Sequence, residues 1–275
     1  MRLYFSRPTL VLVVSLLSVL PALGLGPSIA DDGSVLVAGA SPSGQALRRV
    51  YLPVASKGFD CHIPGESYST LSVESVTTPG AIERNPDFNI TVRGWAATNQ
   101  YKGFVDYHNP ADSRTPQFPD LFADRRTPTF TSVYQMHDWD WGRMTPGPLI
   151  SNPPVSLLGL GTRAGETIHV PDSGYTIGSG CEVLVLYAAP DRITLKYTRE
   201  DHVVYGYTFH VEGICVEPDL LALYQSCAAA GRRLLPALRP RQAFGRARGS
   251  EILIAIRDCG TFLDPRSHFD WWRGR

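Results

Sequence analysis

Residues 249–260 read GSEILIAIRDCG, an apolar run that begins at an acid, Glu251, and ends in the turn residues Asp258, Cys259 and Gly260. A short apolar run bounded by turn residues is typical of a buried strand, and β-branched isoleucine favours the same conformation. We therefore expect a buried strand here and read the rest of the chain outward from it.

The preceding hundred residues carry more runs of this kind, and one segment that breaks the pattern. Glu217-Pro218-Asp219 is an acidic, proline-bearing start, the residues after it have helical spacing, and Gly231 is a stop, so one helix is expected among the strands. The expected strands are ETIHVP (166–171), YTIG (175–178), CEVLVLYAA (181–189), RITLKYTRE (192–200), HVVYGYTFHVEGICV (202–216) and QAFG (242–245).

Residues 50–150 read as a β-rich or irregular N-terminal region, in which short apolar pieces alternate with turn clusters. The period-two alternation of residues 89–95, NITVRGW, predicts a half-buried strand. Residues 31–49 are small, polar and glycine-rich, as in a flexible linker. The remaining residues, 151–275, are expected to form an antiparallel β domain, so the fold class is mainly β.

The first 30 residues have the charged start and apolar run of a secretory signal peptide, and an uncleaved membrane anchor is the alternative. We therefore expect a secreted protein of the cell envelope, bacterial in origin, that does not contact the membrane once the signal is cleaved. Export permits disulfides, and five cysteines leave at least one thiol unpaired within a single chain. Their connectivity is open at this stage.

Composition and the absence of several motifs narrow the function further. Lysine plus arginine equals aspartate plus glutamate, 26 of each, so no global field favours nucleic acid. The cysteines show no C-x-x-C spacing, which argues against a zinc ribbon. The chain also lacks the G-x-G-x-x-G, Walker and G-x-S-x-G motifs of nucleotide-binding proteins and serine hydrolases.

Between residues 155 and 265 the order of these pieces resembles that of the M23 (lysostaphin-type) metallopeptidases, whose antiparallel sheet holds zinc in a groove. GETIHVPDSGYTI (165–177) looks like the family hairpin G-T-P-V-x-A-P-x-D-G-x-V, and RITLKYTREDHVVYGYTFHVEG (192–213) is similar to the paired strands that end in Y-A-H-L. PRQAFG (240–245) looks like K-G-Q-x-I-G, and GSEILIAIRDCGTFLDP (249–265) resembles G-P-H-L-H-F-E-I-R-x-N-G-x-x-x-D-P.

The resemblance implies zinc ligands at positions where this chain lacks them. The family's H-x-H pair falls on Glu251 and Leu253, and leucine offers no lone pair to a metal. Its H-x-x-x-D pair falls near Val155 and Gly159, and the histidine of Y-A-H-L falls near Phe209 or His210. Because the bound water of a zinc hydrolase owes its acidity to the metal, we expect a catalytically silent relative that uses no cofactor.

Residues 138–141, Asp-Trp-Asp-Trp, form the most unusual local cluster. Trp139 and Trp141 could stack on a sugar ring while Asp138 and Asp140 accept hydrogen bonds from its hydroxyls; the alternative is that the indoles belong to a core and the acids cap a turn. The candidate binding residues are Trp139, Trp141, Asp138, Asp140, His210 and Glu251.

These observations lead to a hypothesis and two alternatives. The first is an exported, non-catalytic binding or structural protein whose partner is cell-wall glycan or peptide, the ligand class that the resemblance implies. The second is a carbohydrate-active hydrolase that works around Asp138 and Asp140. The third is an interaction module for another secreted protein.

Overall fold

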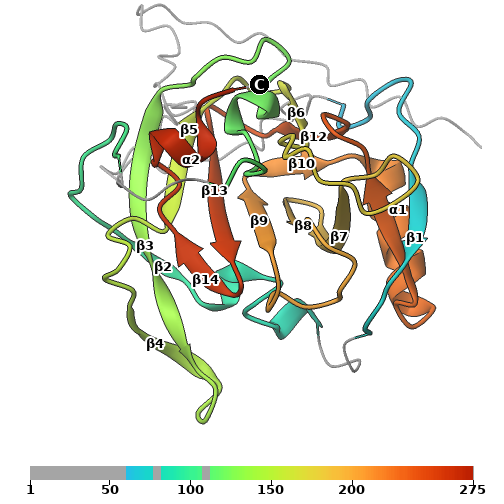
Figure 1. Cartoon of the computed structure of the whole chain (residues 1–275), viewed down its shortest axis with the longest axis horizontal. Coiled ribbons are helices and arrows are strands. Elements are labelled where there is room, and N and C mark those ends of the chain that lie inside the picture. Colours follow the sequence, from blue (N-terminus) through green and yellow to red (C-terminus); the bar gives the residue numbers. More distant parts are fainter. Residues whose placement is uncertain (1–59, 77–81, 107–111, 275) are drawn as a thin grey trace, which may run out of the picture. The chain divides into compact units, whose positions relative to one another are not determined.

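The computed structural model describes residues 60–76, 82–106 and 112–274. The expected signal peptide and linker, residues 1–49, lie outside the described residues. The described residues are mainly β, with antiparallel sheets and a single helix longer than one turn, as the sequence predicts (Figure 1). No helix among them has the length and apolar character needed to cross a lipid bilayer.

Eleven strands form the large sheet, in the order β1-β11-β7-β8-β9-β13-β5-β3-β2, with β14 paired to β13 and β4 paired to β3. Three more form a small sheet in the order β10-β12-β6. The strands are β1 (Ser69–Ser72), β2 (Trp95–Ala97), β3 (Phe130–Asp140), β4 (Thr145–Leu149), β5 (Leu157–Gly161), β6 (Thr167–His169), β7 (Val183–Ala189), β8 (Arg192–Lys196), β9 (Tyr207–Glu212), β10 (Ile214–Val216), β11 (Leu234–Leu238), β12 (Ala243–Ala247), β13 (Glu251–Asp258) and β14 (Thr261–Leu263).

Strand β13 confirms the strand expected from residues 249–260, and it lies between β9 and β5 in the large sheet. Successive side chains of a strand point to opposite faces. Accordingly Ile252, Ile254 and Ile256 belong to the larger hydrophobic core, whereas Leu253 and Ala255 face a second, smaller core around Met136 and Phe262. Both faces of β13 are therefore covered by protein.

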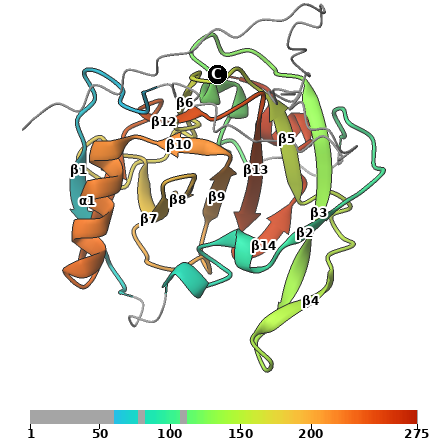
Figure 2. The ribbon, with the colours of Figure 1, turned by 180° about the vertical axis from the view of Figure 1, so that it is seen from behind.

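The larger core is closed by elements outside the large sheet. Helix α1 (Pro218–Ala229), seen from behind in Figure 2, packs on β11 and β7. The short 3₁₀ helix η3 (Phe118–Leu121) and the short helix α2 (His268–Trp271) contribute Phe118 and Trp271, whose rings stack at 5.6 Å between centroids. The small sheet adds Ile168, Ile214 and Phe244 to the same core.

Helix α1 confirms the helix expected between Glu217 and Gly231. The Glu217 carboxylate accepts a hydrogen bond from the Leu220 N–H at 2.9 Å and so caps the first turn. Pro218 occupies that turn, where a missing N–H costs nothing, and Gly231 adopts a φ of +91° just past the end.

Strands on both sides of residue 150 lie in one sheet. β3 pairs with β5 and β1 pairs with β11, so residues of the expected N-terminal region 50–150 complete the sheet of residues 151–275. The larger core likewise joins Phe88, Phe118 and Phe122 to the C-terminal strands. The described residues after position 59 fall in one compact unit.

Two expected strands are wrong. In residues 89–95, Ile90–Val92 is instead a 3₁₀ helix, η2, because the Asn89 side chain accepts the Thr91 N–H at 3.2 Å and so holds the backbone in a turn. Only Trp95 joins a strand, β2. Residues 175–178 also form no strand, and Gly178 makes a single isolated bridge to Cys181.

Candidate functional site

Some of the positions that the M23 resemblance assigns to zinc ligands lie close together on one face of the large sheet, whereas Val155 and Phe209 belong to the larger core. Leu253 on β13 pairs directly with Gly159 on β5. Ala255, two residues further along the same face, pairs with His210 on β9. Glu251, Leu253, Gly159 and His210 therefore share the face that carries the second core.

The side chains at this place do not fit a zinc ion. A Cβ placed on Gly159 would lie 2.2 Å from Glu251 Oε1 and 2.1 Å from Ser132 Oγ, so the space for a ligand side chain is already occupied. Glu251 Oε1 accepts hydrogen bonds from the hydroxyls of Thr131 and Ser132. Because Leu253, Gly159 and Val155 provide no donor atom, only Glu251 and His210 among these positions could bind a metal.

His210 is fully buried, and its ring is fixed in one tautomer. The Thr194 hydroxyl donates its proton to the Phe88 carbonyl at 2.6 Å, so it accepts from His210 Nδ1–H at 3.0 Å. Nε2 then carries a lone pair that has no hydrogen-bond partner among the described residues. Burial lowers the pKa of His210 well below its usual value, and the nearby Arg257 and Arg93 lower it further.

The tryptophan–aspartate cluster is divided between the core and the surface. Trp139 is buried, whereas Trp141 is 55% exposed, and the two rings meet edge to face at 6.4 Å. Asp140 accepts the N–H groups of Gly142 and Arg143 and so caps the turn between β3 and β4. This agrees with the turn-capping alternative for Asp140 and the core alternative for Trp139. Asp138 stays 68% exposed.

Trp141 and Asp138 line a cavity of about 410 Å³, called here the Trp141 cavity. Two buried arginines form its floor: Arg93 and Arg257 both donate to Asp87 Oδ1, at 2.7 and 2.9 Å. Burial lowers the pKa of Arg257, because its charge is desolvated and Arg93 lies beside it. The second nearby carboxylate is Asp138, 3.7 Å from Arg93 Nη1. The cavity therefore combines an exposed indole with several hydrogen-bonding groups.

A second and a third cavity adjoin the first. A cavity of about 540 Å³ shares Asn152, Thr261 and Phe262 with the Trp141 cavity. One of about 170 Å³ shares Asp112, Tyr207 and Asp258 with the second. We call these two the large and the small Tyr207 cavity. Together the three cavities form a chain along the β13–β14 hairpin.

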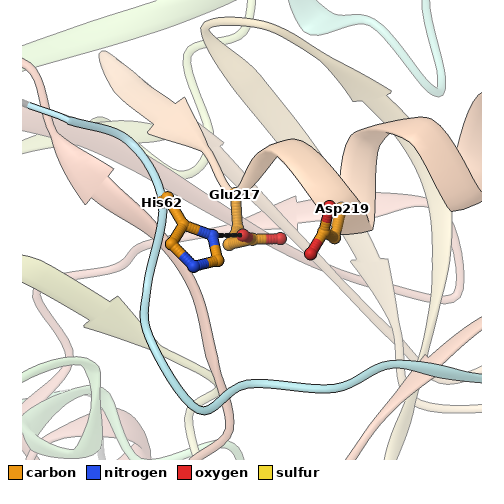
Figure 3. A group of neighbouring side chains, drawn as sticks. All are labelled: His62, Glu217 and Asp219. Atoms are coloured by element: carbon orange, nitrogen blue, oxygen red, sulfur yellow. Dashed lines mark hydrogen bonds and ion pairs between the residues drawn. The ribbon is translucent and has the colours of Figure 1, made fainter.

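A different group of side chains has donor atoms suited to a metal. His62, Glu217 and Asp219 place one donor atom each within 4.8 Å of one another at the start of α1 (Figure 3). Both oxygens of Glu217 are already engaged, one by His62 Nδ1 at 2.9 Å and the other by Leu220 N–H. The positive end of the helix dipole also opposes a cation here. The arrangement therefore fits a capped helix start.

Sequence reasoning missed Arg93, Arg257 and Asp87, which come from three separate segments. The available signal was weak: Arg257 follows the apolar run of β13, and Arg93 follows the apolar residues Ile90 and Val92. A charge at the end of an apolar segment is common at the edge of a core, so neither residue could be distinguished from a surface charge. Comparisons of the chain with protein-family models, curated proteins and solved structures found no match.

Proposed function

We propose that residues 60–274 form a non-catalytic binding domain with an M23-like fold, carried by an exported protein, and that its Trp141 cavity binds cell-wall glycan. The main observation in favour of a domain without catalytic activity is the direct pairing of Leu253 with Gly159. This pairing supports the proposal, because neither residue has a side-chain donor atom for the metal that the M23 resemblance implies there. The clustering of Glu251, Leu253, Gly159 and His210 on one face supports the resemblance of fold, although Val155 lies in the larger core.

The Trp141 cavity supports glycan as the ligand. An exposed indole offers an apolar face to a pyranose ring, and the Asp87 and Asp138 carboxylates accept hydrogen bonds from hydroxyls. Arg93 Nη1 supplies a donor on the same wall. A concave site with an aromatic face and a few convergent polar groups is the usual form of a small-molecule site.

Two features support export. The sequence of residues 1–30 has the pattern of a secretory signal. Cys61 and Cys215 form a disulfide, which is typical of proteins that mature outside the reducing cytosol. Cell-wall glycan would then be accessible to the domain.

Metal analysis of the purified full-length protein tests the non-catalytic part. We expect no zinc that depends on His210 or Glu251. One zinc per chain that is lost in His210→Ala, while His62→Ala retains it, would overturn the proposal. The His62→Ala variant serves as the control because His62 belongs to the other group of metal-capable side chains.

Binding to peptidoglycan and to a panel of soluble glycans tests the ligand. Trp141→Ala should weaken binding by at least about tenfold, as expected for loss of an aromatic anchor. Tyr101→Ala is the matched control, since Tyr101 is 71% exposed and lines none of the three cavities. Equal binding by Trp141→Ala and wild type would reject the cavity. Release of soluble sugars that stops in Asp138→Asn would replace the binding proposal with a hydrolase.

A further inference from the structure

Two guanidinium groups at the floor of the Trp141 cavity share one close counter-ion. Arg93 and Arg257 are each only 4% exposed, and both donate to the same oxygen, Asp87 Oδ1. The other acid that lines the cavity is Asp138, whose Oδ1 lies 3.7 Å from Arg93 Nη1, beyond hydrogen-bond distance, and already accepts a backbone N–H at 2.8 Å. Asp138 is also 68% exposed, so water screens its charge. The floor therefore holds more buried positive charge than buried negative charge.

The Arg93 side chain presents unused donors to this cavity. Its Nε donates to the Pro86 carbonyl at 2.9 Å and its Nη2 to Asp87, whereas Nη1 makes no hydrogen bond with the described residues. Nη1 carries two N–H groups and is not sealed from solvent, so these groups open into the cavity that Arg93 lines. A side chain that is otherwise buried thus offers a free pair of donors to a ligand in this cavity.

The same charges dominate the electrostatics of the buried face beside the cavity. Burial lowers the pKa of His210, and the three charges that lower it further, those of Arg257, Arg93 and Lys196, are all positive. The guanidinium groups of Arg93 and Arg257 lie over the Phe262 ring, at 5.6 and 4.7 Å from its centroid, which helps to hold both in place. An anion in the cavity would therefore meet a positive and preorganised wall.

The shape of the donors and the exposed indole together favour a carboxylate that is carried by a sugar ring. The planar fork of a guanidinium matches the two oxygens of a carboxylate. Trp141 is 55% exposed and lines the same cavity, so it offers a face to a pyranose ring. A small inorganic anion would leave this indole unused, and a neutral sugar would leave Arg93 Nη1 without a charged partner.

We propose that the Trp141 cavity selects acidic sugars, with the pyranose ring stacked on Trp141 and the carboxylate accepting hydrogen bonds from Arg93 Nη1. The ligand carboxylate takes the place beside Nη1 that Asp138 holds in the structure. This inference rests on the proposed function, because it names the class of glycan that the cavity prefers. For such a ligand the Asp138 carboxylate is a competitor, since it carries the same charge.

Calorimetry with three probes tests this inference on the full-length protein at neutral pH. The probes are trigalacturonate, its methyl ester and a triglutamate peptide. We expect trigalacturonate to bind at least about tenfold more tightly than the ester, the usual effect of a hydrogen bond to a charged group. Arg93→Gln should abolish that preference, and Arg93→Lys, which keeps the charge but loses the fork, should retain only part of it. Trp141→Ala should weaken binding of both oligomers by the same factor.

Asp138→Asn should strengthen binding of trigalacturonate and change that of the ester little, because it removes a competing charge from the rim of the cavity. Thermal melting shows whether each variant folds, and Asp138→Asn tests the inference even if Arg93→Gln does not fold. Binding of trigalacturonate that is unchanged or weaker in Asp138→Asn would overturn the inference.

Arg143→Gln is the matched control, because the Arg143 side chain is 83% exposed between β3 and β4 and does not line the cavity. The preference should persist in this variant, and its loss would reveal a general attraction to surface charge and overturn the site. Equal affinity of the wild type for trigalacturonate and the ester would overturn the acidic-sugar inference and leave the proposed glycan function standing. Binding of triglutamate alone, lost in Arg93→Gln, would overturn both. If none of the probes binds, the inference fails, and the peptidoglycan assay with Trp141→Ala decides the glycan function separately.

Discussion

At the scale of single residues, two of the buried ionisable groups that lack a full set of hydrogen-bond partners are His210 and Glu182. His210 Nε2 and Glu182 Oε2 both have no hydrogen-bond partner within the described residues. Desolvation favours the neutral form of each, so it lowers the pKa of the histidine and raises that of the carboxyl. Each group is therefore held neutral by its burial, and the carboxyl must ionise as the pH rises.

Glu182→Gln should stabilise the protein at alkaline pH. Burial raises the pKa of Glu182 from 4.5 to about 7, so the folded state holds its proton more tightly than the unfolded state. Stability from this group is complete below about pH 4.5 and is lost as the pH rises through about 7, an effect of about 3 kcal/mol. Glutamine remains neutral and still accepts the Ser173 N–H.

Urea unfolding at several pH values measures this effect. The variant should match wild type near pH 4.5 and exceed its free energy of unfolding by about 3 kcal/mol near pH 8. Glu74→Gln, at a side chain that is 57% exposed, should show no such divergence. A difference in the free energy of unfolding between Glu182→Gln and wild type that stays constant with pH would contradict the raised pKa of Glu182.

At the scale of elements, the sequence predicts a segment well where its boundaries are marked by turn or capping residues. Residues 252–256 are a continuous apolar run before a turn, and α1 begins at Glu217-Pro218 and ends before Gly231, so both elements could be expected from the residues alone. Residues 89–95 alternate with period two, yet Ile90–Val92 forms η2, because the Asn89 side chain competes for a backbone N–H. A polar residue that bonds its own backbone defeats a prediction based on hydrophobic spacing.

Asp201→Asn should loosen the junction between α1 and the sheet. Arg232, which follows α1 at a φ of +60°, donates to Asp201 Oδ1 at 2.5 Å and to the Leu186 carbonyl on β7 at 2.8 Å. Both members of this ion pair are almost fully buried. Removing one charge leaves the other desolvated and unpaired, so the free energy of unfolding should fall by about 3–5 kcal/mol.

Equilibrium unfolding in urea checks this value. The exposed pair Arg199–Glu74 provides the comparison, and Glu74→Gln should cost no more than about 1 kcal/mol. The double variant Arg232→Met with Asp201→Leu should recover part of the loss, because no isolated charge remains. If Asp201→Asn lowers the free energy of unfolding by less than about 1 kcal/mol, the Arg232–Asp201 ion pair is not a buried contact in solution.

At the scale of the whole described unit, the fold class could be predicted from the sequence but the site could not. Short apolar runs separated by turns are a local signal, and they indicate an antiparallel, mainly β protein. The Trp141 cavity depends on pairing between β2, β3, β5 and β13, which brings Asp87, Arg93, Asp138 and Arg257 together. The residues of a strand do not indicate which other strand it pairs with. Only Asp138 and Trp141, which belong to an unusual local cluster, could therefore be predicted as site residues from the sequence.

The disulfide acts on the same large scale and should contribute strongly to stability. Cys61 and Cys215 are 154 residues apart, so their bond restricts most of the unfolded chain. Replacing both by serine should lower the free energy of unfolding by about 3–5 kcal/mol, since long loops lose the most entropy on closure. The His62–Glu217 contact and two hydrogen bonds from Arg246 to the His62 carbonyl hold the same segment, so the fold itself should persist.

Thiol titration and thermal melting test this prediction together. Unfolded, unreduced protein from the exported fraction should expose three thiols, from Cys181, Cys227 and Cys259, and reduction should raise the count to the full five cysteines. Cys259→Ser is the control, because that exposed side chain has no share in the bond, and it should shift stability by less than about 0.5 kcal/mol. Five free thiols before reduction, or a melting temperature unaffected by reductant, would remove both the bond and the support that it gives to export.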